Sequence, residues 1–233
     1  MIILIKLAGF LFLFILVLNL VMAAFGYINP EQKISSDAKM LNSDAELQKI
    51  NKNGSKKFKI SIVIALIEHT CVIALPIMLF IVFSQYNAIL VLILGIVWTI
   101  FRIGEGLIQV YNEKNYWRLL NIARQYSSTS GAEKKSLNDL GSTILKTRDS
   151  RFKFAMILWS IGTLAYSIVL VTYGVSPIIG WLGIVASILI GFGNGVKFVK
   201  PSFEVLSTIG GLLAIVFEII IGGWLLFFPL IIP

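Results

Sequence analysis

Apolar residues occur in six long runs along the chain, and polar residues are concentrated in two of the segments between them. A helix that crosses a bilayer needs about 20 mostly apolar residues, and each run meets that requirement. The pattern therefore predicts an all-α polytopic bundle that forms one membrane domain over residues 1–233. The predicted spans are about 2–27, 60–83, 88–111, 154–173, 177–199 and 205–231.

The distribution of basic residues predicts the orientation of these spans. Two connections are long and polar: residues 29–59 hold seven lysines, and residues 112–153 hold nine lysines and arginines. Alternating spans put both on one side, whereas the opposite side carries almost no basic residue apart from Lys6. The positive-inside rule then predicts a plasma-membrane protein with both long segments cytoplasmic and both termini extracytoplasmic. A single lysine and a long apolar run favour an uncleaved first span over a signal peptide.

Composition excludes several other classes of protein. Charged residues make up 14% of the chain and the mean hydropathy is +0.88, whereas a soluble domain carries about 25% charged residues. The net charge of +8 comes mainly from loops between spans, so no nucleic-acid partner is expected. With a single cysteine, Cys71, and a single histidine, His69, no internal disulfide is possible and no metal or cofactor is predicted.

The cytoplasmic segments carry helix signals of their own. Ser43 with Glu46 fits a capping box, and helical spacing continues the third span to about Gln125. Residues 127–131 break this helix, and Ser136 with Asp139 then predicts a second, short helix. The two helices would form a short amphipathic hairpin at the membrane surface. It would be either a connector that faces lipid headgroups or a docking site, within 112–153, for a cytoplasmic partner or other membrane subunits.

Ionisable residues inside the predicted spans are the candidate functional residues. Placing a charge in hydrocarbon costs several kcal/mol, about 2.5–3.5 on insertion scales, so each needs a partner, water or a neutral state. Counted along the helices, all five fall within about 10–20 Å of the cytoplasmic boundary. They are predicted to form one intramembrane polar cluster: Glu68, His69, Arg102, Glu105 and Glu218.

Helical spacing assigns faces to these residues. The third span carries a polar stripe of Trp98, Arg102, Glu105, Gln109 and Asn112. We expect Gln109 and Asn194 to be secondary polar lining. Small residues allow membrane helices to approach closely, and two such stripes predict that the fifth and sixth spans pack together. They comprise Gly183, Ser187, Gly191 and Gly195 on the fifth span, and Ser207, Gly211, Ala214 and Gly222 around Glu218 on the sixth.

Two segments resemble a known family of membrane proteins. Phe101-Arg102-Ile103-Gly104-Glu105-Gly106 is similar to its arginine-and-glutamate segment, and the last span has Phe217-Glu218-Ile219 followed by Gly222-Gly223-Trp224-Leu225-Leu226. The family is domain-of-unknown-function family 4386. The resemblance implies a six-span fold, no known activity, and Arg102, Glu105 and Glu218 as signature positions. The chain departs from the family at residues 177–183, where its usual Pro-Arg-x-Leu-Gly run is missing, and in its lysine-rich hairpin.

The sequence leaves three functions open. The first is a non-enzymatic accessory or scaffolding subunit in which the charged cluster fixes helix packing. The second is a small-solute or proton-coupled transporter or channel that uses Glu68, Arg102, Glu105 and Glu218, since charges inside a membrane often mark pathways. The third is an intramembrane enzyme, although no nucleophile motif is present and no catalytic residue is assigned. A filled, dry cluster would favour the first function, and a cavity would favour the others.

Overall fold

The computed structural model describes residues 1–25, 43–52, 55–86, 88–173 and 177–228, and within these ranges it contains helices and no strand. The helices are α1 (Ile2–Ala24), α2 (Ser43–Lys52), α3 (Ser55–Phe83), the 3-10 turn η2 (Ser84–Tyr86), α4 (Ile89–Tyr126), α5 (Gly131–Thr172), α6 (Pro177–Val199) and α7 (Val205–Phe227). Six of them are long and apolar enough to cross a membrane, which confirms the polytopic bundle. Residues 26–27 and 229–231 of the predicted spans, and residues 29–42 and 53–54 of the first polar segment, lie outside the described residues.

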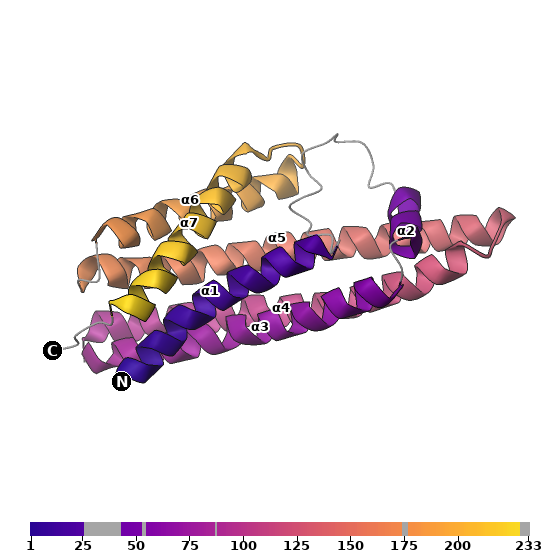
Figure 1. Cartoon of the computed structure of the whole chain (residues 1–233). Coiled ribbons are helices and arrows are strands. Elements are labelled where there is room, and N and C mark those ends of the chain that lie inside the picture. Colours follow the sequence, from indigo (N-terminus) through magenta and orange to yellow (C-terminus); the bar gives the residue numbers. More distant parts are fainter. Residues whose placement is uncertain (26–42, 53–54, 87, 174–176, 229–233) are drawn as a thin grey trace.

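The six long helices form a ring. Each packs mainly against two neighbours, in the order α1, α3, α4, α5, α6, α7 and back to α1. One end of the bundle, which we call the termini end, is where α1 begins and α7 ends (Figure 1). The opposite end, which we call the hairpin end, carries the turn of residues 127–130 between α4 and α5.

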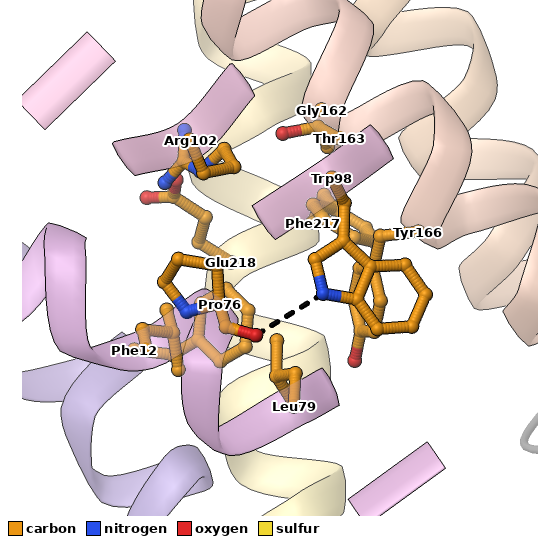
Figure 2. A pocket seen from close by; sticks show the side chains of 11 residues that line it. Phe12, Pro76, Leu79, Trp98, Arg102, Gly162, Thr163, Tyr166, Phe217 and Glu218 are labelled. Atoms are coloured by element: carbon orange, nitrogen blue, oxygen red, sulfur yellow. Dashed lines mark hydrogen bonds between the residues drawn. The ribbon is translucent and has the colours of Figure 1, made fainter. Parts of the chain in front are cut away.

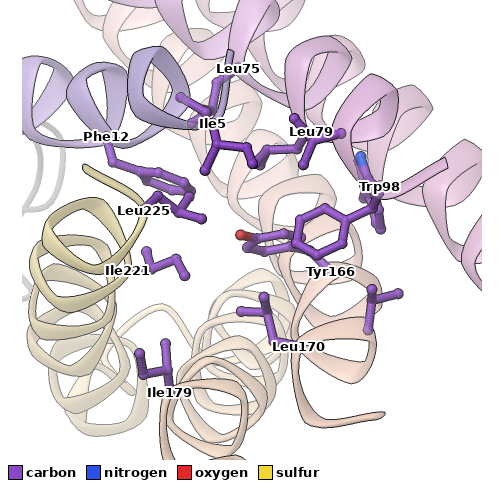
Figure 3. Close-up of a cluster of buried hydrophobic side chains, with 14 of the residues drawn as sticks. Ile5, Phe12, Leu75, Leu79, Trp98, Tyr166, Leu170, Ile179, Ile221 and Leu225 are labelled. Carbon is purple, nitrogen blue, oxygen red and sulfur yellow. The ribbon is translucent and has the colours of Figure 1, made fainter. Parts of the chain in front are cut away.

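Large apolar side chains fill the half of the ring near the termini end (Figure 3). The Trp98 ring meets Tyr166 and Phe83 edge-on, with centroid distances of 5.5 and 6.0 Å. The Trp98 indole donates a hydrogen bond to the Pro76 carbonyl at 3.1 Å, which satisfies its polar atom inside the core. This half of the ring is therefore closed by packed protein.

The hairpin between α4 and α5 is longer than the sequence predicted. At about 1.5 Å per residue, their 38 and 42 residues give lengths of about 57 and 63 Å, roughly twice the hydrocarbon thickness of a bilayer. α4 continues to Tyr126 much as expected, but the predicted separate helix after Ser136 is wrong, because α5 runs unbroken from Gly131. Its buried residues recur every three or four positions from Gly141 to Leu170, so continuous packing outweighs the local capping signal.

A second apolar core lies within this hairpin. α2 crosses its two arms (Figure 1) and buries Leu47 and Ile50 against α4 and α5. Ser43, the first residue of α2, uses its hydroxyl to donate to the Asn138 carbonyl at 3.1 Å. The Tyr126 hydroxyl donates to the Asp44 carboxylate, and this hydrogen bond lowers the pKa of Asp44. α2 thus joins the hairpin arms into a small helical unit.

Glycines set the closest helix approaches, and these differ from the predicted stripes. A Cβ on Gly193 would lie 2.7 Å from the Ser207 nitrogen, and one on Gly210 would lie 2.9 Å from the Ile190 nitrogen. α6 and α7 therefore pack together as predicted, but they meet through Gly193 and Gly210, which lie outside the stripes, and at these two contacts only Ser207 is a stripe residue.

The predicted stripe on α6 turns mainly toward α5. Gly183 faces the Ser167 hydroxyl and the Phe217 ring, and Gly191 faces Ser160. The Ser160 hydroxyl also donates to the Ser187 carbonyl, while Gly195 has no atom within 4 Å of an added Cβ. The reason is that α6 lies between two helices, and its small residues allow the closer approach of α5.

The docking of α2 gives a first testable prediction. A helix of ten residues is marginal by itself, and Leu47 is fully buried against Gly141. We expect Leu47→Ala to cost about 2–5 kcal/mol at this contact and to speed hydrogen exchange of the α2 amides in the detergent-solubilised protein. The exposed Lys49→Ala on the same helix should leave that exchange unchanged, and equal protection in the two variants would contradict the docking.

Candidate functional site

A cavity of about 500 Å³ separates the two apolar cores. Along α4, residues of the first core reach Trp98, cavity residues follow from Arg102 to Glu113, and the second core begins at Tyr116. α5 passes the same three layers in reverse order. The volume falls in the range of small-molecule sites, about 300–1,000 Å³.

Nine ionisable residues line the cavity. The five residues predicted from the sequence are all among them, so the structure brings Glu68, His69, Arg102, Glu105 and Glu218 around one space. Four more ionisable residues join them: Glu113, Arg148, Lys197 and Glu204. The cluster is therefore the wall of a hollow site.

His69 lies between two carboxylates. Its Nδ1 contacts the Glu68 carboxylate, which also accepts a hydrogen bond from Asn19 Nδ2 at 3.4 Å. Its Nε2 lies 3.5 Å from Glu113 Oε1. α1, α3 and α4 thus meet through one polar chain, which suits a position where unpaired charges are costly.

Arg102 and Glu105 form an ion pair within α4. Arg102 Nη1 lies 2.6 Å from Glu105 Oε2, and both residues are less than 10% exposed. The guanidinium also lies 5.6 Å from the centroid of the Trp159 ring. Gly162 leaves room for this arrangement, because a Cβ there would lie 2.7 Å from Arg102 Cγ.

Across the bundle, the side chains of Arg102 and Glu218 point toward one another (Figure 2). These two residues line the large cavity and also a second, small one of about 20 Å³, which is room for about one water molecule. Thr163, Tyr166 and Trp98 line the small cavity as well. Arg102 and Glu218 therefore form the floor of the large cavity, beyond which the closed core begins.

Three buried lining residues were missed as candidates by the sequence analysis. Glu113, Arg148 and Lys197 are each 5% exposed or less, although the first two had been assigned to a cytoplasmic loop and Lys197, in the fifth predicted span, was not named among the candidates. Arg148 also stacks on Tyr116, with its guanidinium carbon 3.5 Å from the ring centroid. A helical spacing signal existed, because Glu113 continues the stripe of Glu105 and Gln109, and Arg148 lies four residues before Phe152.

Of the remaining predicted positions, some line the cavity and others pack against neighbouring residues. Gln109, Gly211 and Ala214 line the cavity. Asn194 is not among the lining residues, and its Nδ2 donates to the Ile190 carbonyl of its own helix at 2.9 Å. Gly222 packs against Phe12 and Leu13 of α1. Among the residues described, no group of three or more His, Cys, Asp or Glu side chains could hold a metal ion.

Comparison with known proteins adds a family to this geometry. The sequence profile of DUF4386, a domain of unknown function, matches residues 7–228. The chain belongs to the DUF4386 family. The resemblance to this family is thereby confirmed, and in this DUF4386 protein Arg102, Glu105 and Glu218 all line the large cavity. No curated protein and no solved structure matches the chain.

The Arg102–Glu105 pair generates a stability prediction for this DUF4386 protein. Removing one partner of a buried ion pair costs about 3–5 kcal/mol, because the other charge stays buried. We therefore expect Arg102→Gln to lower the thermal midpoint in detergent strongly, and a second change, Glu105→Gln, to restore part of the loss. The control is Lys153→Gln, which removes the more exposed Lys153–Asp149 pair and should change little. An Arg102→Gln midpoint equal to that of the control would contradict the structural role of the pair.

Proposed function

We propose that the protein is a membrane carrier that binds a small charged or zwitterionic molecule in the large cavity. The observation that carries this proposal is a hollow of about 500 Å³ lined by all five predicted intramembrane ionisable residues. An accessory subunit held together by an ion cluster would be expected to fill that layer with protein. A polar space of ligand size inside an apolar bundle fits binding better.

The closed termini end supports a carrier over an open channel. Below Arg102 and Glu218, aromatic and aliphatic side chains of the first core pack between all six long helices. A solute in the cavity therefore meets packed protein toward the termini end, whereas the cavity lining extends to Lys197 and Glu204 at the other end of α6 and α7. Alternating access requires such a one-sided site.

The distribution of basic residues supports an orientation with the hairpin end in the cytoplasm. The first long polar segment holds seven lysines and the second holds nine lysines and arginines, sixteen in all. Lys6 is the only basic residue near the termini end. By the positive-inside rule the cavity then faces the cytoplasm.

Thiol labelling tests whether the cavity is wet and on which side. In a Cys71→Ala background, we expect Gln109→Cys, in the cavity wall, to react with a charged, membrane-impermeant methanethiosulfonate added from the cytoplasmic face. The matched control is Leu107→Cys on the same helix, which is 57% exposed and outside the cavity lining. This thiol should not react, because hydrocarbon excludes the reagent. If neither thiol reacts, a hydrated site is ruled out.

A third thiol separates a carrier from a one-sided binding protein. Thr163 lines the small cavity beyond Arg102 and Glu218, and Thr163→Cys nearly conserves volume. A carrier opens its termini end in part of its cycle, so this thiol should react slowly with reagent added from the extracytoplasmic face. Complete protection of Thr163→Cys from that face, with Gln109→Cys reactive, would contradict the carrier step and leave binding alone.

A further inference from the structure

The ring of helices opens sideways between α1 and α7. The two helices touch near the termini end, where a Cβ on Gly9 would lie 2.7 Å from the Gly222 carbonyl oxygen. From this crossing they separate toward the hairpin end (Figure 1). The large cavity occupies the space between them, because it is lined by residues 15–23 of α1 and 207–218 of α7. The crossing glycines thus form the vertex of a lateral opening.

The rim of this opening is apolar and exposed. Several residues both line the cavity and face outward, among them Leu20 (64% exposed), Leu212 (62%) and Ile215 (45%). They lie on membrane-spanning helices, so the medium they face is lipid. A water-soluble solute gains nothing from such a rim, whereas a hydrocarbon chain can lie across it while its polar end stays inside.

Charges are segregated on the cavity wall. On α5 and α6 the only ionisable lining residues are the cations Arg148 and Lys197. The carboxylates come from α3, α4 and the start and middle of α7: Glu68, Glu105, Glu113, Glu204 and Glu218. Arg102 is the one cation that α4 contributes, and it is paired with Glu105 on its own helix. The site therefore presents two cations on α5 and α6, flanked by the carboxylates of the neighbouring helices α4 and α7.

One buried acceptor at this site also points to a ligand. Asn112 is 2% exposed and lines the cavity. Its Nδ2 donates to the Arg148 carbonyl at 3.3 Å, while its Oδ1 has no hydrogen-bond partner among the described residues. A buried amide oxygen without a partner is costly, and an ammonium or hydroxyl group of a bound molecule would satisfy it.

We infer that the ligand is a lipid-like amphiphile with a zwitterionic headgroup, which enters from the leaflet through the opening between α1 and α7. Its phosphate fits the cations Arg148 and Lys197. Its ammonium fits the carboxylates and Asn112, and its hydrocarbon chains lie across the rim of Leu20, Leu212 and Ile215. This inference rests on the proposed binding function and adds the class of ligand and its route.

Native mass spectrometry of the full-length protein in detergent tests the inference. The probes are dioleoyl phosphatidylethanolamine, anionic dioleoyl phosphatidylglycerol, and glycerophosphoethanolamine, which has the headgroup without the chains. We expect the phosphatidylethanolamine adduct to be retained at least about tenfold better than either of the others, which corresponds to about 1.4 kcal/mol. Equal retention of the two phospholipids would overturn the headgroup assignment. Equal retention of the chain-free compound would overturn the lipid assignment.

Two tryptophan variants of α7 locate the site. An added Cβ on Gly211 or on Gly223 meets no atom within 4 Å, but only Gly211 lines the cavity. Gly211→Trp should fill the opening and lower phosphatidylethanolamine retention by about tenfold, equivalent to about 1.4 kcal/mol, whereas Gly223→Trp should retain it. Retention that is the same in both variants would overturn the lateral site.

The two proposals fail in different ways. If Gln109→Cys reacts with the charged reagent while neither phospholipid is retained better than the chain-free compound, the lipid inference is overturned and the proposed binding function stands. If Gln109→Cys is unreactive and no probe is retained, the binding function itself is overturned.

Discussion

The cost of holding charges inside a membrane is the constraint on which this structure depends. Nine ionisable residues line one cavity, and five of them lie well within the apolar spans, where an unpaired charge would cost several kcal/mol. The protein meets this cost in two ways. It pairs charges directly, as in Arg102 with Glu105 and His69 with Glu68. It also gathers the charged groups around a space that water or a polar ligand can occupy, which leaves the lipid-facing surface apolar.

Two apolar cores keep this charged layer in place. The first, around Trp98 and Tyr166, closes the termini end. The second, around Leu119 and Leu120, holds the hairpin arms together outside the apolar part of the spans. Because α4 and α5 run unbroken through both cores, the spacing between them is fixed by rigid helices. The cavity is thus positioned by the same helices that carry its charges.

The crossing of α1 and α7 gives the cavity its lateral opening. At Gly9 and Gly222 the two backbones touch, so the helices can diverge only on the other side of that contact. A larger residue at either position would push the vertex apart and change the angle between the helices. The opening toward the hairpin end therefore depends on one close backbone contact near the termini end.

The sequence by itself determined the number of long apolar helices and the positions of the charged residues along them, because both depend only on run length and on position along a helix. It placed Glu68, His69, Arg102, Glu105 and Glu218 in one layer and suggested the family through residues 101–106 and 217–226. These properties follow from the positions of residues in the sequence alone.

Only the tertiary structure decided whether that layer is filled or hollow. The answer depends on how neighbouring helices diverge, which is set by contacts such as Gly9 with Gly222 between residues far apart in the chain. Packing between α4 and α5 turned Glu113 and Arg148 inward from a segment that looked like a loop, and packing of α6 directed Gly183 and Gly191 toward α5. Helical periodicity assigns each residue to one face of its helix, but packing around the whole ring determines which neighbouring helix that face contacts.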